Sequence, residues 1–138
     1  MIYNRELLQV LCPFGIWNHP RGKQLIDEKS AQKMKNAEMF LFRKIPIFVG
    51  HPDENINVKA IVVGWIKEIC ITKGGIAILA AYSQKAYDDI LSGKLRAMSP
   101  RWKMERISGG VFRPVDLLSI GLTNEPNIPS SGKIIEII

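Results

Sequence analysis

The sequence has 138 residues, which fits one domain built around a single hydrophobic core. Hydrophobic residues make up 46% of it and charged residues 23%, which excludes an intrinsically disordered chain, and no apolar run approaches the ~20 residues that a membrane-spanning helix needs. The formal net charge of +6 favours an acidic partner, but the basic residues are dispersed along the chain, which makes nucleic-acid binding the less favoured class.

The N-terminal part of the chain predicts a strand, a loop, a helix and a second strand. Residues 6–14 are apolar enough for a buried strand, and residues 16–30 are expected to form a loop that enters a helix. Apolar residues three or four positions apart predict this helix over 27–42. The β-branched segment 45–52 then predicts a strand that runs into a loop at His51.

The middle of the chain predicts a hairpin followed by a short helix. Two apolar strands flank Gly74 and Gly75, a common hairpin signal, and Gly64 in the first strand indicates a bulge or a close backbone approach. Ser83 is a suitable N-cap for the helix, which is expected to end at Gly93.

The C-terminal part predicts a second hairpin and a loop. Strands are expected over 95–107 and 111–123, joined by a Ser-Gly-Gly turn, and residues 124–138 are expected to leave the body of the domain as a loop. Strands joined by tight glycine turns predict an α+β fold, mainly an antiparallel β-barrel, closed or nearly closed, with two or more flanking helices.

The cysteines and histidines do not predict a metal site. Cys12 and Cys70 lie in apolar segments without C-x-x-C spacing, so we expect small buried side chains in a reducing, cytoplasmic environment. With only His19 and His51 available, the ligands for a zinc ion do not cluster, and no cofactor is expected.

Two residues stand out as candidates for chemistry. His51 follows a predicted strand end, where a turn held by rigid structure can carry a base, although a loop histidine without a role fits as well. His19 is better explained as a surface turn. Ser99 shares a strand face with Ala97, and Pro100 after it is expected to interrupt the ladder and bend the backbone, which favours a nucleophile weakly over a small core residue.

Several short motifs together resemble a known family. They stand in the same order and at similar spacings to those of the I protein of Mu-like tailed phages, the protease that processes the prohead, from about residue 14 to residue 129. The motifs are "GIWNHPRGKQLIDEKS", "IPIFVGHPDE", "GWIKEI", "LRAMSPRW" and "LLSIGLTNEPNIP". The resemblance extends to phage prohead proteases and herpesvirus assemblins, and it implies a β-barrel wrapped by helices with a serine nucleophile paired with a histidine.

Residue by residue, the resemblance assigns the serine to Ser99 and the histidine to His51, which would accept the serine proton and return it to the leaving amine. Related families orient the catalytic histidine with a second histidine or a glutamate in the last strand. Ser119 matches that position first, Asp116 is the second choice and Glu125 the third, and a dyad assisted by water is also open.

The oxyanion of the reaction needs hydrogen-bond donors. Backbone N–H groups near the expected bend at residues 99–101 are the simplest donors. Assemblins use an arginine near the corresponding site, and Arg101 or Arg113 can fill this role here, although surface arginines explain both equally well.

The resemblance implies a serine endopeptidase that cleaves phage scaffold and capsid-associated proteins inside the assembling prohead in the host cytoplasm. It leaves self-cleavage open. A homodimer is also open. Residues 1–129 would form the protease-like domain and residues 130–138 a tail or the start of a linker to a scaffold region. The alternative is a catalytically inactive scaffold or capsid-interaction domain on the same fold.

Overall fold

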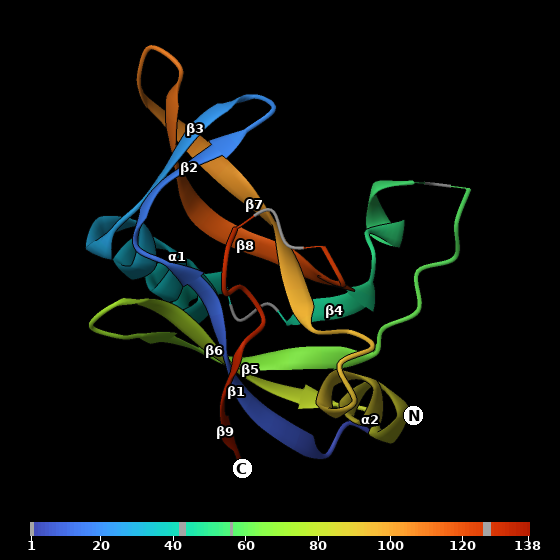
Figure 1. Cartoon of the computed structure of the whole chain (residues 1–138). Coiled ribbons are helices and arrows are strands. Elements are labelled where there is room, and N and C mark those ends of the chain that lie inside the picture. The colour runs from blue at the N-terminus through green and yellow to red at the C-terminus, as the bar shows by residue number, and fades with distance from the viewer. Residues whose placement is uncertain (1, 42–43, 56, 126–127) are drawn as a thin grey trace.

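The computed structural model describes residues 2–41, 44–55, 57–125 and 128–138. Across these residues the chain forms nine strands in one sheet, two α-helices and one short 3-10 helix, η1 (Figure 1). The helices are α1 (Glu28–Leu41), α2 (Gln84–Leu91) and η1 (Pro52–Glu54). The strands are β1 (Arg5–Pro13), β2 (Gly15–His19), β3 (Gly22–Ile26), β4 (Ile45–Val49), β5 (Gly64–Ile71), β6 (Gly75–Tyr82), β7 (Ala97–Ser108), β8 (Val111–Thr123) and β9 (Ile134–Ile137).

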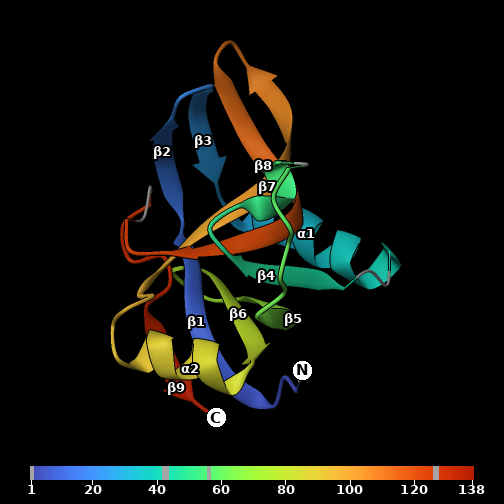
Figure 2. The same cartoon turned by 90° about the vertical axis from the view of Figure 1, so that its right-hand side faces the viewer.

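The sheet is open and does not close into a barrel. Its strand order is β2-β3-β8-β4-β5-β6-β1-β9, with β7 paired to β8 outside this path. The α+β class, rich in strands and with two helices, is confirmed, but the expected barrel does not close. Closure requires the first and last strands to pair, whereas β2 lies at one end of the molecule and β9 at the other (Figure 2).

The long strand β8 explains why the strand order could not be predicted from hairpins alone. It pairs antiparallel with β7, and on its other edge it pairs in parallel with β3 at Val111 and with β4 at Ile120. Parallel neighbouring strands need long connections, so no turn motif in the sequence predicts their pairing. These two parallel pairs join the distal β2–β3 hairpin and β4 to one continuous strand.

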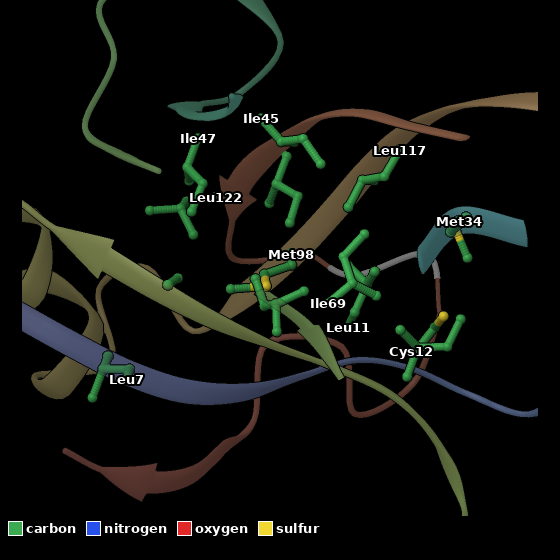
Figure 3. Close-up of a cluster of buried hydrophobic side chains, with 14 of the residues drawn as sticks. Leu7, Leu11, Cys12, Met34, Ile45, Ile47, Ile69, Met98, Leu117 and Leu122 are labelled. Atoms are coloured by element: carbon green, nitrogen blue, oxygen red, sulfur yellow. The ribbon is translucent and has the colours of Figure 1, made fainter. Parts of the chain in front are cut away.

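The core lies where β1, β4, β5, β7 and β8 meet α1 (Figure 3). Side chains from these elements lose nearly all solvent contact, and burying each of them stabilises the fold by about 1.5–3 kcal/mol. They include Leu7, Leu11, Met34, Ile45, Ile47, Ile69, Met98, Leu117 and Leu122. Helix α1 packs across β8, β5 and β3, so the core fixes β8 relative to β4.

The cysteine prediction holds for Cys12, which is fully buried in this core, while Cys70 is partly exposed. Burial raises the pKa of the Cys12 thiol to about 12, because an apolar environment disfavours the thiolate. Cys12 is therefore an unreactive packing residue.

The predicted helices are confirmed. Ser83 caps α2 by accepting a hydrogen bond from the backbone N–H of Ala86, and α2 ends before Gly93, which has a φ of +84°. Helix α1 matches the predicted segment 27–42, whose last residue lies outside the described part of the chain. Neither helix is long and apolar enough, within the described residues, to cross a membrane.

Both predicted hairpins are confirmed as β5–β6 and β7–β8. Gly64 also allows the close approach expected of it, since a Cβ atom there would lie 2.7 Å from the ring of Tyr82.

The expectation of a loop over residues 16–30 is wrong, because β2 and β3 form a hairpin with Pro20 and Arg21 in its turn. The hairpin lacks the usual apolar alternation. In β3 the buried positions are Gln24 and Ile26, so a polar side chain occupies an inward site, while Ile16 of β2 is 60% exposed.

The expectation that residues 124–138 leave the body as a loop is also wrong, because β9 pairs with β1. The segment before β9 is held by hydrogen bonds from Gly132 N to Val10 O (2.7 Å) and from Val10 N to Lys133 O (2.8 Å). These bonds tie the segment to β1. Residues 126 and 127 lie outside the described residues.

Asp27 links the start of α1 to β8. Its Oδ1 accepts a hydrogen bond from the backbone N–H of Ser30 (2.8 Å), and Arg113 donates to both carboxylate oxygens, from Nε to Oδ1 (3.2 Å) and from Nη2 to Oδ2 (2.9 Å). The hydrogen bond from Arg113 is the main cause that lowers the pKa of Asp27 to about 2.

We expect Asp27→Ala to lower the free energy of unfolding by about 1–2 kcal/mol at pH 6, because the cap and the arginine partner are lost together. The folded-state pKa of Asp27 lies below its unfolded value, so this stability is present above about pH 4 and is lost as the pH falls toward 2. Urea denaturation at several pH values measures it. Asp27→Asn keeps a capping oxygen and should lose less, and a wild-type advantage that persists unchanged to pH 2 contradicts the prediction.

Candidate functional site

The candidate base, His51, is held where β4 ends beside β8. Strand β4 pairs in parallel with β8, and beyond it the backbone N–H of Gly50 donates to Leu122 O (3.0 Å). Gly50 has a φ of +69°, a conformation that glycine adopts without strain. This turn places His51 directly before η1 and beside β8.

Gly121 of β8 gives the position of the imidazole ring. A Cβ atom built on Gly121 would lie 2.9 Å from Cε1 of His51 and 2.2 Å from the carbonyl oxygen of Gly50. The turn that carries His51 therefore lies directly against Gly121, in the space that any larger residue would fill.

Ser99 of β7 is the ladder partner of Gly121. Directly opposed residues in antiparallel strands project their side chains from the same face of the sheet. The face of Gly121 is the one that His51 covers. The structure therefore places Ser99 and His51 on the same face of the β7–β8 hairpin, around the same ladder position.

A carboxylate lies next to this pair. Oδ2 of Asp53, in η1, accepts hydrogen bonds from the hydroxyl of Ser119 (2.7 Å) and from Nε of Arg101 (3.1 Å). Ser119 and Arg101 are themselves ladder partners, two positions along each strand from Ser99 and Gly121. Burial alone raises the pKa of Asp53, but the hydrogen bonds from Ser119 and Arg101 outweigh it, so its pKa lies below the usual value.

Two polar atoms of this turn have no partner. Nδ1 of His51 and Oδ1 of Asp53 are both buried, and neither makes a hydrogen bond to any other described residue. Most buried polar atoms in proteins are satisfied, and exceptions call for an explanation such as a catalytic role. The unpaired donor or acceptor on His51 and the unpaired acceptor on Asp53 lie two residues apart in the chain.

A family model described as Mu-like prophage I protein, N-terminal domain, matches residues 9–134. The chain belongs to this family. The match confirms the resemblance that the short motifs indicated, and it extends that resemblance over the second half of β1 and to the first residue of β9. Comparisons with curated proteins and with solved structures give no match.

The three residues considered for orienting the imidazole lie in different places in this I-protein domain. Ser119 is 1% exposed and lies in the site, where its proton is donated to Asp53. Asp116 faces Lys103 in the ladder, further along β8, and Glu125 is exposed beyond the end of β8. The sequence reasoning missed Asp53, although it stands two residues after His51 in "GHPDE".

The two arginines considered for the oxyanion are also separated. Arg101 lies on the face of Ser99, but its Nε is bound to Asp53. Arg113 pairs with Asp27, about eight residues along β8 from Gly121, or roughly 25 Å at the usual rise per residue. The structure brings Arg101 into the site and does not bring Arg113 there.

The expected bend at Pro100 is wrong, because β7 continues through it and the first irregularity follows Arg101. The N–H of Met98 donates to Ser131 O (3.3 Å), on the side away from β8. Backbone groups alternate along a strand, so Pro100 faces the same open side, where no N–H is needed, and the N–H of Ser99 faces β8. The backbone donors expected at residues 99–101 are thus absent at Pro100 and directed into the ladder at Ser99.

Two cavities flank this part of β7. One, of about 230 Å³, is lined by Ser99, Pro100 and Trp102 together with residues of the β2–β3 hairpin. The other, of about 510 Å³, lies beside Arg101 and Trp102. His19, which the sequence predicted as a surface turn, lines both, so the β2–β3 turn is part of the wall beside Ser99.

We expect Asp53→Ala to lower the free energy of unfolding by about 2 kcal/mol near neutral pH, because the buried hydroxyl of Ser119 and the guanidinium of Arg101 lose their shared acceptor. The pKa of Asp53 is lowered in the folded state, so this stability is present above its unfolded pKa near 4 and falls as the pH drops below that value.

Glu54→Ala is the matched control for this prediction. Glu54 stands next to Asp53 in η1, is exposed, and lies 4.0 Å from Nε of Arg101, so its loss should change stability by less than about 0.5 kcal/mol. Urea denaturation of both variants at pH 7 compares them, and equal losses would show that Asp53 is no more than a surface charge.

Proposed function

We propose that this chain is a serine endopeptidase of phage head maturation, which cleaves scaffold and capsid-associated proteins. The observation that carries the proposal is the position of His51 against Gly121, the ladder partner of Ser99. A nucleophile and its base must come from rigid elements to meet repeatedly. Here β7, β8 and β4 supply that rigidity, and the family match supports a phage role.

In the proposed reaction the hydroxyl of Ser99 attacks the carbonyl carbon of a peptide bond while His51 removes its proton. The tetrahedral intermediate collapses, the C–N bond breaks, and His51 returns the proton to the departing amine. Water, deprotonated by His51, then attacks the acyl ester, and Ser99 recovers its proton as the acid product leaves.

The orienting group in this proposal is the pair formed by Ser119 and Asp53. The hydroxyl of Ser119 donates to Asp53, so its oxygen lone pairs stay available to an imidazole N–H. The unpaired Oδ1 of Asp53 is a second acceptor for a protonated Nδ1 of His51. Either acceptor places the negative charge of Asp53 near the imidazolium that forms during attack, as the orienting group of a catalytic triad does.

The proposal is tested by incubating the protein with the scaffold and major capsid proteins of its own phage and measuring intact masses. Wild type should produce discrete fragments, and a fluorophosphonate probe should add its mass to Ser99, with fluoride leaving as the serine oxygen binds phosphorus. Ser119 is the internal control, since it should stay unlabelled. No fragments and no adduct at Ser99 would refute the proposal.

The inactive scaffold or capsid-interaction domain predicts a different result. It predicts that the protein binds the same scaffold or capsid proteins without changing their masses. The observation that favours the inactive domain is that, among the described residues, no hydrogen bond joins Ser99 and His51. Co-sedimentation with scaffold, run beside the mass measurement, separates the two functions.

A further inference from the structure

The cavity of about 510 Å³ has a wall in which positive charge exceeds negative charge. Among the described residues, three cationic side chains and one carboxylate line it, beside a histidine and several apolar side chains. The charged residues are Arg21, Arg101, Lys103 and Glu54, and the aromatic ones are Trp102 and Phe112. A cavity of this size and composition accommodates side chains that combine an apolar stem with a negative charge.

Two of these cations have no partner for their charge. The side chains of Arg21, in the β2–β3 turn, and of Lys103, on β7, are exposed and make no hydrogen bond or ion pair within the described part of the chain. The turn holds the backbone of Arg21 in place, since its N–H donates to Nδ1 of His19 (3.2 Å), which lines the same cavity. Unpaired surface cations are common, but here two of them border one cavity.

Arg101 provides a third cation with donors to spare. Its Nε binds Asp53 (3.1 Å) and lies 4.0 Å from a carboxylate oxygen of Glu54. Its two Nη groups make no hydrogen bond to any residue that the structure describes. Since a guanidinium has five N–H donors in a planar fork, Arg101 can keep its bond to Asp53 and still bind a further carboxylate through Nη.

The position of the cavity connects it to the proposed chemistry. Arg101 and Lys103 stand two and four residues after Ser99 on β7, which is roughly 7 and 13 Å at the usual rise per residue. The β2–β3 hairpin, which carries Arg21, lies beside the β7–β8 hairpin (Figure 2). An extended peptide whose scissile bond lies at Ser99 therefore reaches the cavity with residues about two to four positions from that bond.

We infer that this cavity binds acidic side chains of the substrate, about two to four residues from the scissile bond; this inference rests on the proposed protease function. A glutamine in the same place keeps the size of the side chain but loses the ionic attraction, and a lysine adds to an excess of positive charge. Nucleic acid is also anionic, but the continuity of the cavity with the strand that carries Ser99 favours a peptide.

The test measures binding apart from cleavage. Ser99→Ala protein labelled with ¹⁵N is titrated with acetyl-tetraglutamate amide, acetyl-tetraglutamine amide and a thymidine hexanucleotide. The indole N–H shift of Trp102 reports occupancy, and Trp65 of β5, which does not line this cavity, is the internal control.

The glutamate probe should bind about tenfold more tightly than the glutamine probe, as two or three exposed ion pairs would give. The difference should shrink when NaCl is raised from about 0.05 to 0.5 M, because salt screens exposed charges. No binding, equal binding of the two peptides, or shifts that leave Trp102 unmoved would overturn the inference. Tighter binding of the thymidine probe would also overturn it and assign the cavity to nucleic acid.

A pair of double variants separates the cavity from the net charge of the protein. Arg21→Gln with Lys103→Gln should lower the affinity for the glutamate probe about tenfold and leave the affinity for the glutamine probe unchanged. Lys59→Gln with Lys73→Gln removes the same charge from exposed positions outside the cavity and should change both affinities less than about twofold. Equal losses in the two double variants contradict the inference.

Cleavage by the wild type, mapped on a peptide library, separates this inference from the proposed function. Probe binding with the expected preference but no cleavage would refute the protease and leave the acidic-side-chain site standing. Cleavage without enrichment of glutamate or aspartate on either side of the cut bond would refute the site and leave the protease standing.

Discussion

Ser99→Ala is expected to lower the rate of scaffold cleavage by at least about 10³-fold, because the hydroxyl oxygen of Ser99 forms the acyl-enzyme bond in the proposed reaction. His51→Ala should cause a loss of similar size, since the hydroxyl of Ser99 is a weak nucleophile until a base accepts its proton. The rates are measured by following fragment masses with time, at a protein concentration that leaves wild-type cleavage easily detected.

The double variant tests whether the two residues act as one unit. If they do, Ser99→Ala with His51→Ala should be no slower than either single variant, because removing one partner already disables the other. Two independent losses that multiply would contradict a shared step. Ser108→Ala, an exposed serine at the far end of β7, is the matched control and should keep the wild-type rate.

The sequence was most informative where local chemistry decides the structure. Ser83 satisfies the first turn of α2, and glycine turns join β5 to β6 and β7 to β8, so these elements followed from caps and turns. Motif spacing also selected Ser99 and His51, which the fold brings to the same face of one hairpin.

The sequence was least informative where distant segments meet. The buried Gln24 interrupts the apolar alternation that would have predicted the β2–β3 hairpin. The parallel pairing of β8 with β3 and β4 leaves no turn motif in the sequence from which it could be predicted. The orienting group was sought in the last strand, from the correspondence with related families and from the face on which each residue of that strand lies. The partner of Ser119 is Asp53, from η1 after His51, and the parallel pairing of β4 with β8 brings the two together.

The same pairing of β4 with β8 gives Gly121 a role that its neighbours in β8 do not have. Its Cα faces the carbonyl oxygen of Gly50 and the imidazole of His51. The absence of a side chain at Gly121 therefore determines how closely His51 approaches the ladder pair formed by Ser99 and Gly121. The turn that carries His51, strand β8 and the ladder partner Ser99 thus meet at Gly121. Adding one methyl group at Gly121 should therefore move His51 while leaving Ser99 unchanged.

Gly121→Ala is therefore expected to reduce the cleavage rate by about 10²-fold, because a Cβ atom 2.2 Å from Gly50 O and 2.9 Å from His51 Cε1 forces the turn away from Ser99. The strain should also lower the free energy of unfolding by about 1–3 kcal/mol, so rates are compared below the melting temperature of the variant. Gly109→Ala, in the turn of the same hairpin and with no atom within 4 Å of its added Cβ, is the matched control. A folded Gly121→Ala protein that cleaves at the wild-type rate would show that His51 does not act from this position. A slow but folded variant beside a normal Gly109→Ala protein ties catalysis to the contact between Gly121 of β8 and the turn that follows β4.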